Sequence, residues 1–139
     1  MSLVLLPSAM NEIPPPKKLS FRQRGRSFRC ALCGVVLLMR SEHNAKIHLA
    51  ATIAVCIAGG LLRVSINDWC WLVVAITIVW TAEALNTALE HLADFASPAI
   101  HPTIARAKDI AAGAVLLASL GALVIGVLIL GPHLPKLAN

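Results

Sequence analysis

Three carboxylates and one amide lie at helical spacing between Glu83 and Asp94, directly after an apolar run. On a helix that turns by about 100° per residue, Glu90 and Asp94 each lie about 20° from Glu83, on opposite sides, and Asn86 lies about 60° away. The four side chains therefore share one stripe of a single helix. Ionisable groups at membrane depth are energetically costly and usually mark a functional site. This stripe is the first candidate for chemistry.

Acids and a lysine at a membrane surface suit the transfer of a phosphoryl group to a lipid alcohol. Such a transfer uses Mg²⁺, which binds through one or two carboxylates and the phosphates of the nucleotide. Another carboxylate can deprotonate the attacking hydroxyl, and a lysine such as Lys108 can hold the nucleotide. The sequence has neither a P-loop nor the glycine-rich loop of protein kinases, which excludes these two classes.

Two other functions are compatible with acids in a helical membrane protein. A small transporter or proton relay would also carry them, but it predicts acids near the middle of the membrane rather than in one leaflet. A non-catalytic membrane scaffold has no need to place Glu83, Asn86 and Glu90 on one face.

The composition of the chain indicates the environment in which this stripe lies. The chain has 139 residues, of which 58% are hydrophobic and only 14% are charged, and this predicts a polytopic membrane protein. Eight of its twelve basic residues lie in residues 1–46, where they favour a cytoplasmic location and contact with anionic lipid headgroups. Nucleic-acid binding is not expected, because no motif accompanies this basic segment. The pair Cys30 and Cys33 lacks further zinc ligands, and we expect all four cysteines to be free thiols.

The elements that must position these residues are all helical. We predict an all-α integral membrane protein whose folded domain covers residues 19–131, between a disordered tail at 1–18 and a short tail at 132–139. This domain consists of an amphipathic surface helix and three membrane spans. Their expected ranges are 20–42 for the surface helix and about 47–66, 69–91 and 109–130 for the spans.

Three spans place the two termini on opposite sides of the membrane. The positive-inside rule puts the N-terminus in the cytoplasm and the C-terminus outside. The apolar run from Trp69 to Ala82 covers about 21 Å of a hydrocarbon core of roughly 30 Å. Glu83 is therefore expected within the cytoplasmic leaflet, and Glu90 and Asp94 at or beyond its edge. Glu42 before the first span, and Lys108 with Asp109 before the third, should reach the same level.

Four stretches of the sequence resemble the bacterial diacylglycerol kinase/undecaprenol kinase family of small membrane lipid kinases. They are Ser27-Phe-Arg-Cys-Ala-Leu-Cys-Gly34, Arg40-Ser-Glu-His-Asn-Ala-Lys-Ile-His48, Glu83-Ala-Leu-Asn-Thr-Ala-Leu-Glu90 with Asp94, and Ala105-Arg-Ala-Lys-Asp109. The resemblance covers about residues 20–130. It implies a homotrimer with three spans and a surface helix in the bacterial inner membrane, using MgATP, with a cytoplasmic active site.

The resemblance also implies roles for individual residues. Glu83 matches the catalytic base, and Glu42 and Glu90 match the metal-binding carboxylates. Lys108, Asp109 and His101 match residues that bind the nucleotide. Asn86 and Asp94 match polar residues around the active centre. Cys30 departs from the family, because a tyrosine near the nucleotide is common there.

The lipid substrate follows less directly from these residues. The segment from Glu42 through Asn44 to Ile47 and His48 resembles the undecaprenol kinase branch more than the diacylglycerol kinase branch. The resemblance therefore implies phosphorylation of undecaprenol to undecaprenyl phosphate, with diacylglycerol as the alternative substrate. Both lipids present a primary hydroxyl at the interface, so the catalytic residues do not separate them. The histidines His43, His48 and His91 are interpreted as interface residues rather than ligands.

Overall fold

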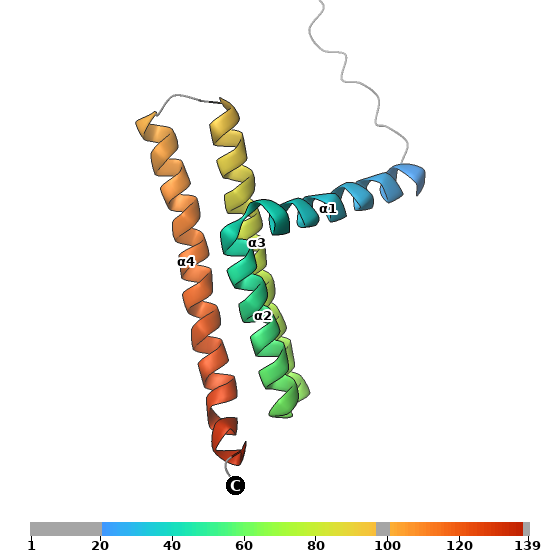
Figure 1. Cartoon of the computed structure of the whole chain (residues 1–139), viewed down its shortest axis with the longest axis vertical. Coiled ribbons are helices and arrows are strands. Elements are labelled where there is room, and N and C mark those ends of the chain that lie inside the picture. The colour runs from blue at the N-terminus through green and yellow to red at the C-terminus, as the bar shows by residue number, and fades with distance from the viewer. Residues whose placement is uncertain (1–20, 97–100, 138–139) are drawn as a thin grey trace, which may run out of the picture. The chain divides into compact units, whose positions relative to one another are not determined.

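The computed structural model is entirely helical within the residues that it describes, which are 21–96 and 101–137. Four α-helices and one 3₁₀ helix follow one another along the chain (Figure 1). They are α1 (Phe21–Ser41), α2 (His43–Leu61), α3 (Ile66–Ala96), α4 (Pro102–Leu130) and η1 (Gly131–Leu137). The predicted fold class is confirmed. The predicted tail at 1–18 and the expected helix break at Ser97-Pro98 lie outside the described residues.

The chain divides into two compact units, Met1–Cys33 and Gly34–Asn139. The described part of the first unit is the beginning of α1. It contains the apolar residues Phe21 and Phe28 and several arginines, and all of these side chains are exposed. This pattern is amphipathic, as expected for a helix that lies on a membrane surface. Its location at that surface stays a prediction. The second unit holds the rest of α1 and all of α2, α3 and α4.

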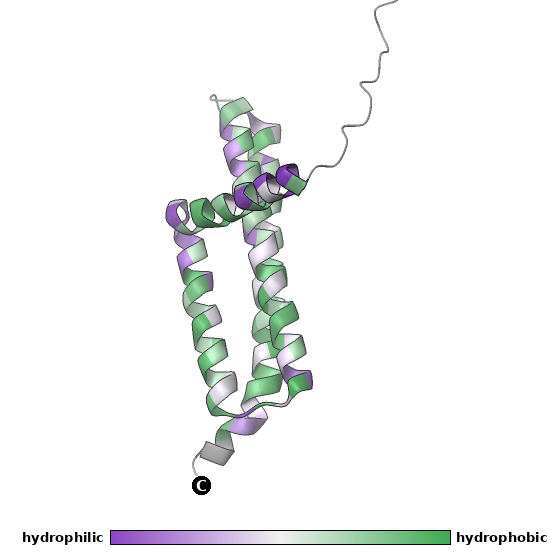
Figure 2. Cartoon of the chain, turned by 90° about the vertical axis from the view of Figure 1, so that its right-hand side faces the viewer, coloured by the Kyte–Doolittle hydropathy of each residue, from purple (hydrophilic) through white to green (hydrophobic). Residues whose placement is uncertain are grey.

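Three helices of the second unit are long and apolar enough to cross a membrane: His43–Leu61, Ile66–Ala96 and Pro102–Leu134. Figure 2 shows apolar residues along most of their length. Most of their large apolar side chains are exposed, as expected where lipid replaces water as the solvent. The 31 residues of α3 extend about 46 Å, well beyond a hydrocarbon core of roughly 30 Å.

Two breaks in the helices bring the functional segments to one end of the second unit. The backbone at Glu42 is extended, with φ −102° and ψ 130°, so α1 ends and α2 begins there. At the other end of α2, the N–H of Val64 donates to the carbonyl of Gly59, and Arg63 takes the left-handed conformation with φ 51°. This is a Schellman ending, which usually has glycine at the position of Arg63. The chain then reverses into α3.

The helix α3 begins at Ile66, three residues earlier than the predicted span, because Ser65 and Asp68 cap it reciprocally. The backbone N–H of Asp68 donates to the hydroxyl of Ser65 at 3.2 Å, and the N–H of Ser65 donates to the Asp68 carboxylate at 3.1 Å. Similarly, α4 begins at Pro102, ahead of the predicted span at 109–130. His101 is its N-cap and accepts the N–H of Thr103, and proline is well tolerated at the first helical position.

The core of the second unit is small, and it runs along α3. Leu72, Ala75 and Val79 of α3 are buried, together with Val115 of α4. Helix α3 packs along α4 over most of its length, and α2 packs against α3. Because the chain reverses direction between α3 and α4, the end of α3 and the start of α4 lie at the same end, whereas α2 begins part of the way along α3 (Figure 1). This arrangement positions the site.

Candidate functional site

The acidic stripe of α3 is buried at its beginning and exposed at its end. Glu83 is 1% exposed and Asn86 is 6% exposed, whereas the side chain of Asp94 is 71% exposed. Between them, the Asn86 amide donates a hydrogen bond of 3.0 Å to Oε1 of Glu90. The stripe therefore passes from the protein interior to an open surface within three turns of one helix.

Several buried polar atoms of the stripe have no hydrogen-bond partner among the described residues. They are Oε2 of Glu83 and Oδ1 of Asn86, which are acceptors, and the hydroxyl Oγ1 of the neighbouring Thr87. All three lie on neighbouring turns of α3. Buried polar atoms are nearly always paired in folded proteins, and an unpaired one costs about 1–3 kcal/mol. Such a group is expected where a substrate or an ion completes the pairing.

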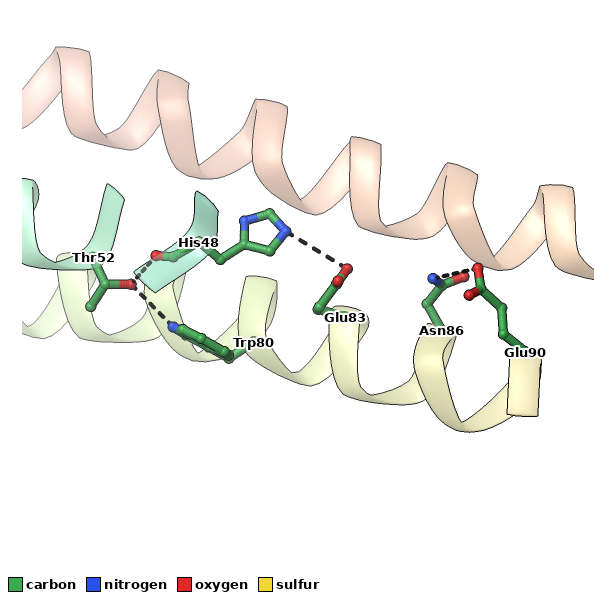
Figure 3. A network of polar contacts seen from close by, with 6 residues as sticks. All are labelled: His48, Thr52, Trp80, Glu83, Asn86 and Glu90. Carbon is green, nitrogen blue, oxygen red and sulfur yellow. Dashed lines mark hydrogen bonds and ion pairs between the residues drawn. The ribbon is translucent and has the colours of Figure 1, made fainter. Parts of the chain in front are cut away.

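Two histidines lie close to carboxylates of the site. His48 of α2 faces Glu83 of α3, and His91 of α3 faces Glu42, the residue before α2. Nε2 of His48 lies 3.7 Å from Oε2 of Glu83, and Nε2 of His91 lies 3.8 Å from Oε1 of Glu42. Figure 3 shows the His48 ring directed at the Glu83 carboxylate, with Asn86 and Glu90 further along α3.

Helix α4 joins the site through Lys108. Its ammonium group donates a hydrogen bond of 2.9 Å to Oδ1 of Asp94, which links the start of α4 to the end of α3. Glu90 also lies within electrostatic range of Lys108. Around the buried carboxylate, both Glu42 and Glu90 lie within electrostatic range of Glu83. One end of the second unit thus gathers carboxylates and a lysine from α3, α4 and the break before α2.

For three other predicted site residues, the contacts within the described residues include no member of this cluster. Asp109 is exposed and follows Lys108 on α4. The ring of His101 caps the N-terminus of α4, so its described contact is with its own helix. Cys30 is an exposed residue of α1 in the first unit. Their assignment to nucleotide binding stays a prediction.

The sequence interpretation missed a group of residues that supports the stripe from α2 and α3. Trp80 donates from its indole nitrogen to the hydroxyl of Thr52 at 3.0 Å, and this hydroxyl donates to the carbonyl of His48 at 2.7 Å. His48 had been interpreted as an interface residue rather than a ligand. The available signal was spacing, because Trp80 and Glu83 lie three residues apart on one face of α3.

The carboxylates fit a magnesium ion bound together with nucleotide phosphates. Within residues 21–96 and 101–137, no group of three or more His, Cys, Asp or Glu side chains could hold a metal ion by itself. Mg²⁺ needs no such group, because it is usually bound by one or two carboxylates, water and substrate phosphates. Glu90 and Glu42 could hold it, and the ion would supply positive charge beside the transferred phosphoryl group.

An apolar groove lies between α2, α3 and α4. It has a volume of about 480 Å³. Its lining includes His48 and Thr52 of α2, Val79 of α3 and Ser119 of α4, but most of the lining is aliphatic. Because His48 lines the groove and also contacts Glu83, the groove leads to the buried carboxylate.

Known proteins with related sequences are lipid kinases. Residues 29–130 match the prokaryotic diacylglycerol kinase family. The undecaprenol kinase of Bacillus subtilis (strain 168) is 40% identical over 112 residues, which are 81% of this chain and 89% of that protein. A diacylglycerol kinase of Synechocystis sp. is 38% identical over 112 residues, or 80% of this chain and 64% of that protein. With its three candidate spans, the chain is a multi-pass membrane lipid kinase of the prokaryotic diacylglycerol kinase family.

Proposed function

We propose that this kinase phosphorylates undecaprenol to undecaprenyl phosphate with ATP and Mg²⁺. The carrying observation is the carboxylate of Glu83, which is 1% exposed and faces His48, a residue that lines an apolar groove. A lipid alcohol has the matching parts, an apolar chain for the groove and a hydroxyl for the carboxylate. The choice of undecaprenol is supported by the 40% identity to the Bacillus subtilis undecaprenol kinase.

In the proposed reaction, Glu83 accepts the proton of the lipid hydroxyl. The hydroxyl oxygen forms a bond to the γ-phosphorus of ATP, and the bond from this phosphorus to the bridging oxygen breaks, which leaves ADP. Asn86 holds Glu90 by the hydrogen bond between their side chains, and Glu90 with Glu42 is proposed to hold the magnesium ion. Lys108 and Asp109 are proposed to hold the nucleotide, with His101 and Cys30 as further contacts. Asp94 keeps the ammonium group of Lys108 in place.

The proposed setting is the bacterial inner membrane, with the N-terminus and the active site in the cytoplasm and the C-terminus outside. The basic residues at 1–46 support this orientation through the positive-inside rule. They also support contact with anionic lipid headgroups. We further propose a homotrimer, because α4 buries little of its apolar surface within one chain and the family resemblance implies three copies.

Diacylglycerol is the second candidate substrate, and the observation that favours it is the 38% identity to the Synechocystis diacylglycerol kinase. The experiment is phosphate transfer from labelled ATP by the purified protein in detergent micelles, with undecaprenol and diacylglycerol tested side by side. We expect faster transfer to undecaprenol. Faster transfer to diacylglycerol would reverse the substrate assignment, and no transfer to either alcohol would refute the proposed function.

Replacement of the proposed base is the second part of this experiment. We expect Glu83→Gln to lower kcat by about 10²–10⁴-fold, because the amide cannot accept the hydroxyl proton. Asp68→Asn is a matched control, since it makes the same change at the opposite end of α3, and it should keep the wild-type rate. A Glu83→Gln variant as fast as wild type would exclude this base.

A further inference from the structure

His48 is placed beside the proposed base by a chain of contacts between α2 and α3. The indole nitrogen of Trp80 donates to the Thr52 hydroxyl at 3.0 Å, and Thr52 donates to the His48 carbonyl at 2.7 Å. The rings of His48 and Trp80 also meet edge to face, with centroids 6.3 Å apart and planes at 67°. Because Trp80 lies one turn before Glu83, these contacts fix the register of α2 against the stripe (Figure 3).

The ring of His48 then faces Glu83 in a poorly solvated place. The side chain of His48 is 14% exposed and that of Glu83 is 1% exposed, with Nε2 and Oε2 separated by 3.7 Å. This distance is slightly longer than a hydrogen bond, and Oε2 has no other partner in the described part of the chain. A small rotation of either side chain would form the bond. Catalytic hydrogen bonds are often this long before substrate binds.

We propose that His48 is a positioning residue that acts through Glu83, and this rests on the proposed role of Glu83 as the base. Its Nε2–H donates to Oε2 and so fixes the orientation of the carboxylate, while the other oxygen remains free for the lipid hydroxyl. A base that is oriented by a third group is a recurring arrangement in enzymes. His48 also lines the apolar groove.

This role is separate from binding of the metal ion and the nucleotide. The charged groups within range of Glu83 are His48, Glu42 and Glu90, and of these only His48 can donate a hydrogen bond. Glu42 has its own histidine partner, His91, so the two histidines serve different carboxylates. Loss of the His48 ring should therefore disturb the proton acceptor and leave the binding of ATP unchanged.

The kinetic test compares His48→Ala with His48→Gln in the full-length protein in micelles, with undecaprenol and ATP. We expect His48→Ala to lower kcat by about 10–100-fold, the range seen for residues that orient a catalytic group, without a change in the KM for ATP. In His48→Gln, the amide nitrogen can replace Nε2 as the donor, so we expect it to recover most of the rate. His133→Ala, in η1 beyond the end of α4, is the matched control and should keep the wild-type rate.

A measurement without turnover tests the contact itself. In ¹⁵N-histidine-labelled protein, the His48 ring signals are assigned by their loss in His48→Gln. We expect Glu83→Gln to shift these signals and Asp68→Asn to leave them in place. Unchanged signals in Glu83→Gln would overturn the inference.

The two proposals fail in different ways. If Glu83→Gln is inactive while His48→Ala turns over like wild type, the inference is wrong and the proposed function stands. Equal loss of rate in His48→Ala and in a correctly folded His48→Gln would also overturn it, because a donor would then be irrelevant. If Glu83→Gln is fully active, the proposed base is wrong and the role of His48 falls with it.

Discussion

At the scale of single residues, solvation separates the carboxylates into two kinds. Glu83 is buried, so water has little access to its carboxylate. The carboxylates of Glu42 and Glu90 are partly accessible, which suits ligands of a hydrated ion. This difference supports the proposed roles, in which the dry carboxylate would accept the proton of a hydroxyl and the wetter carboxylates would hold a cation. This division motivates two residue-level predictions.

The first prediction concerns magnesium. Removal of divalent ions with a chelator should abolish phosphate transfer, and added Mg²⁺ should restore it. Glu90→Gln and Glu42→Gln should each raise the Mg²⁺ concentration for half-maximal rate by roughly 10–100-fold, the loss expected for one charge-assisted contact. Glu42→Gln removes no helix cap, because the Glu42 side chain makes no capping hydrogen bond. A magnesium dependence equal to wild type in both variants would contradict the assignment.

The second prediction concerns Lys108. Lys108→Met should raise the KM for ATP by roughly 10–100-fold, because a cationic contact to phosphate is lost. Asp94→Asn should raise it by less than about fivefold, since the pair that it breaks is exposed. Arg106→Met removes a positive charge from the same turn of α4 and is the control. The comparison is made from ATP titrations at saturating lipid. An equal effect of Lys108→Met and Arg106→Met would indicate general electrostatics rather than a specific contact.

At the scale of the elements, α2 approaches α3 closely at Gly59. A methyl group added there would lie 2.9 Å from Cζ2 and 3.0 Å from Cη2 of Trp69, whereas one at Gly60 would meet nothing within 4 Å. These two adjacent glycines therefore have different roles. Gly59 permits the contact between the helices, and Gly60 accepts the N–H of Arg63 in the turn that follows.

This difference gives a prediction on stability. Gly59→Ala should lower the free energy of unfolding by about 1–3 kcal/mol, because the Trp69 ring must shift. Gly60→Ala should leave it unchanged or raise it by up to about 1 kcal/mol, since alanine favours a helix over glycine. Unfolding in micelles titrated with sodium dodecyl sulfate measures both. Equal effects of the two substitutions would show that the Trp69 contact does not limit the packing.

Much of this arrangement could be predicted from the sequence, because it depends on long apolar runs and on one helical period. The ends of the helices were less well predicted. Ser65 and Asp68 are spaced as a capping box, which starts α3 ahead of the predicted span. Likewise, Pro102 starts α4 ahead of the predicted span, because proline often begins a helix. Both signals were local and present in the sequence.

The role of His48 could not be predicted in the same way. Periodicity tells which residues share a face of one helix, but it does not tell which face of α2 meets which face of α3. That choice depends on the turn with Arg63 in its left-handed conformation and on contacts such as that between Trp80 and Thr52. These are tertiary facts that no single helical pattern contains. For the same reason, the groove between α2, α3 and α4 appeared only in the structure.

At the scale of the whole molecule, three spans require that the two ends of the chain lie on opposite sides of the membrane. We expect an N-terminal epitope tag to be digested by added protease only in inverted vesicles, and a C-terminal tag only in right-side-out vesicles. Tags on the same side would contradict three spans. Exchanged sides would place the acidic cluster away from cytoplasmic ATP and would contradict the proposed orientation.

The change from buried to exposed along α3 has a consequence for how the enzyme meets its substrates. Glu83 lies at the buried part of the stripe, and the Lys108–Asp94 pair lies at its open end. The lipid therefore arrives by diffusion in two dimensions, and the nucleotide arrives in three. The rate should follow the mole fraction of lipid alcohol in the membrane rather than its amount per volume of buffer. Dilution with inert lipid would slow the enzyme, whereas dilution with buffer at constant ATP would not.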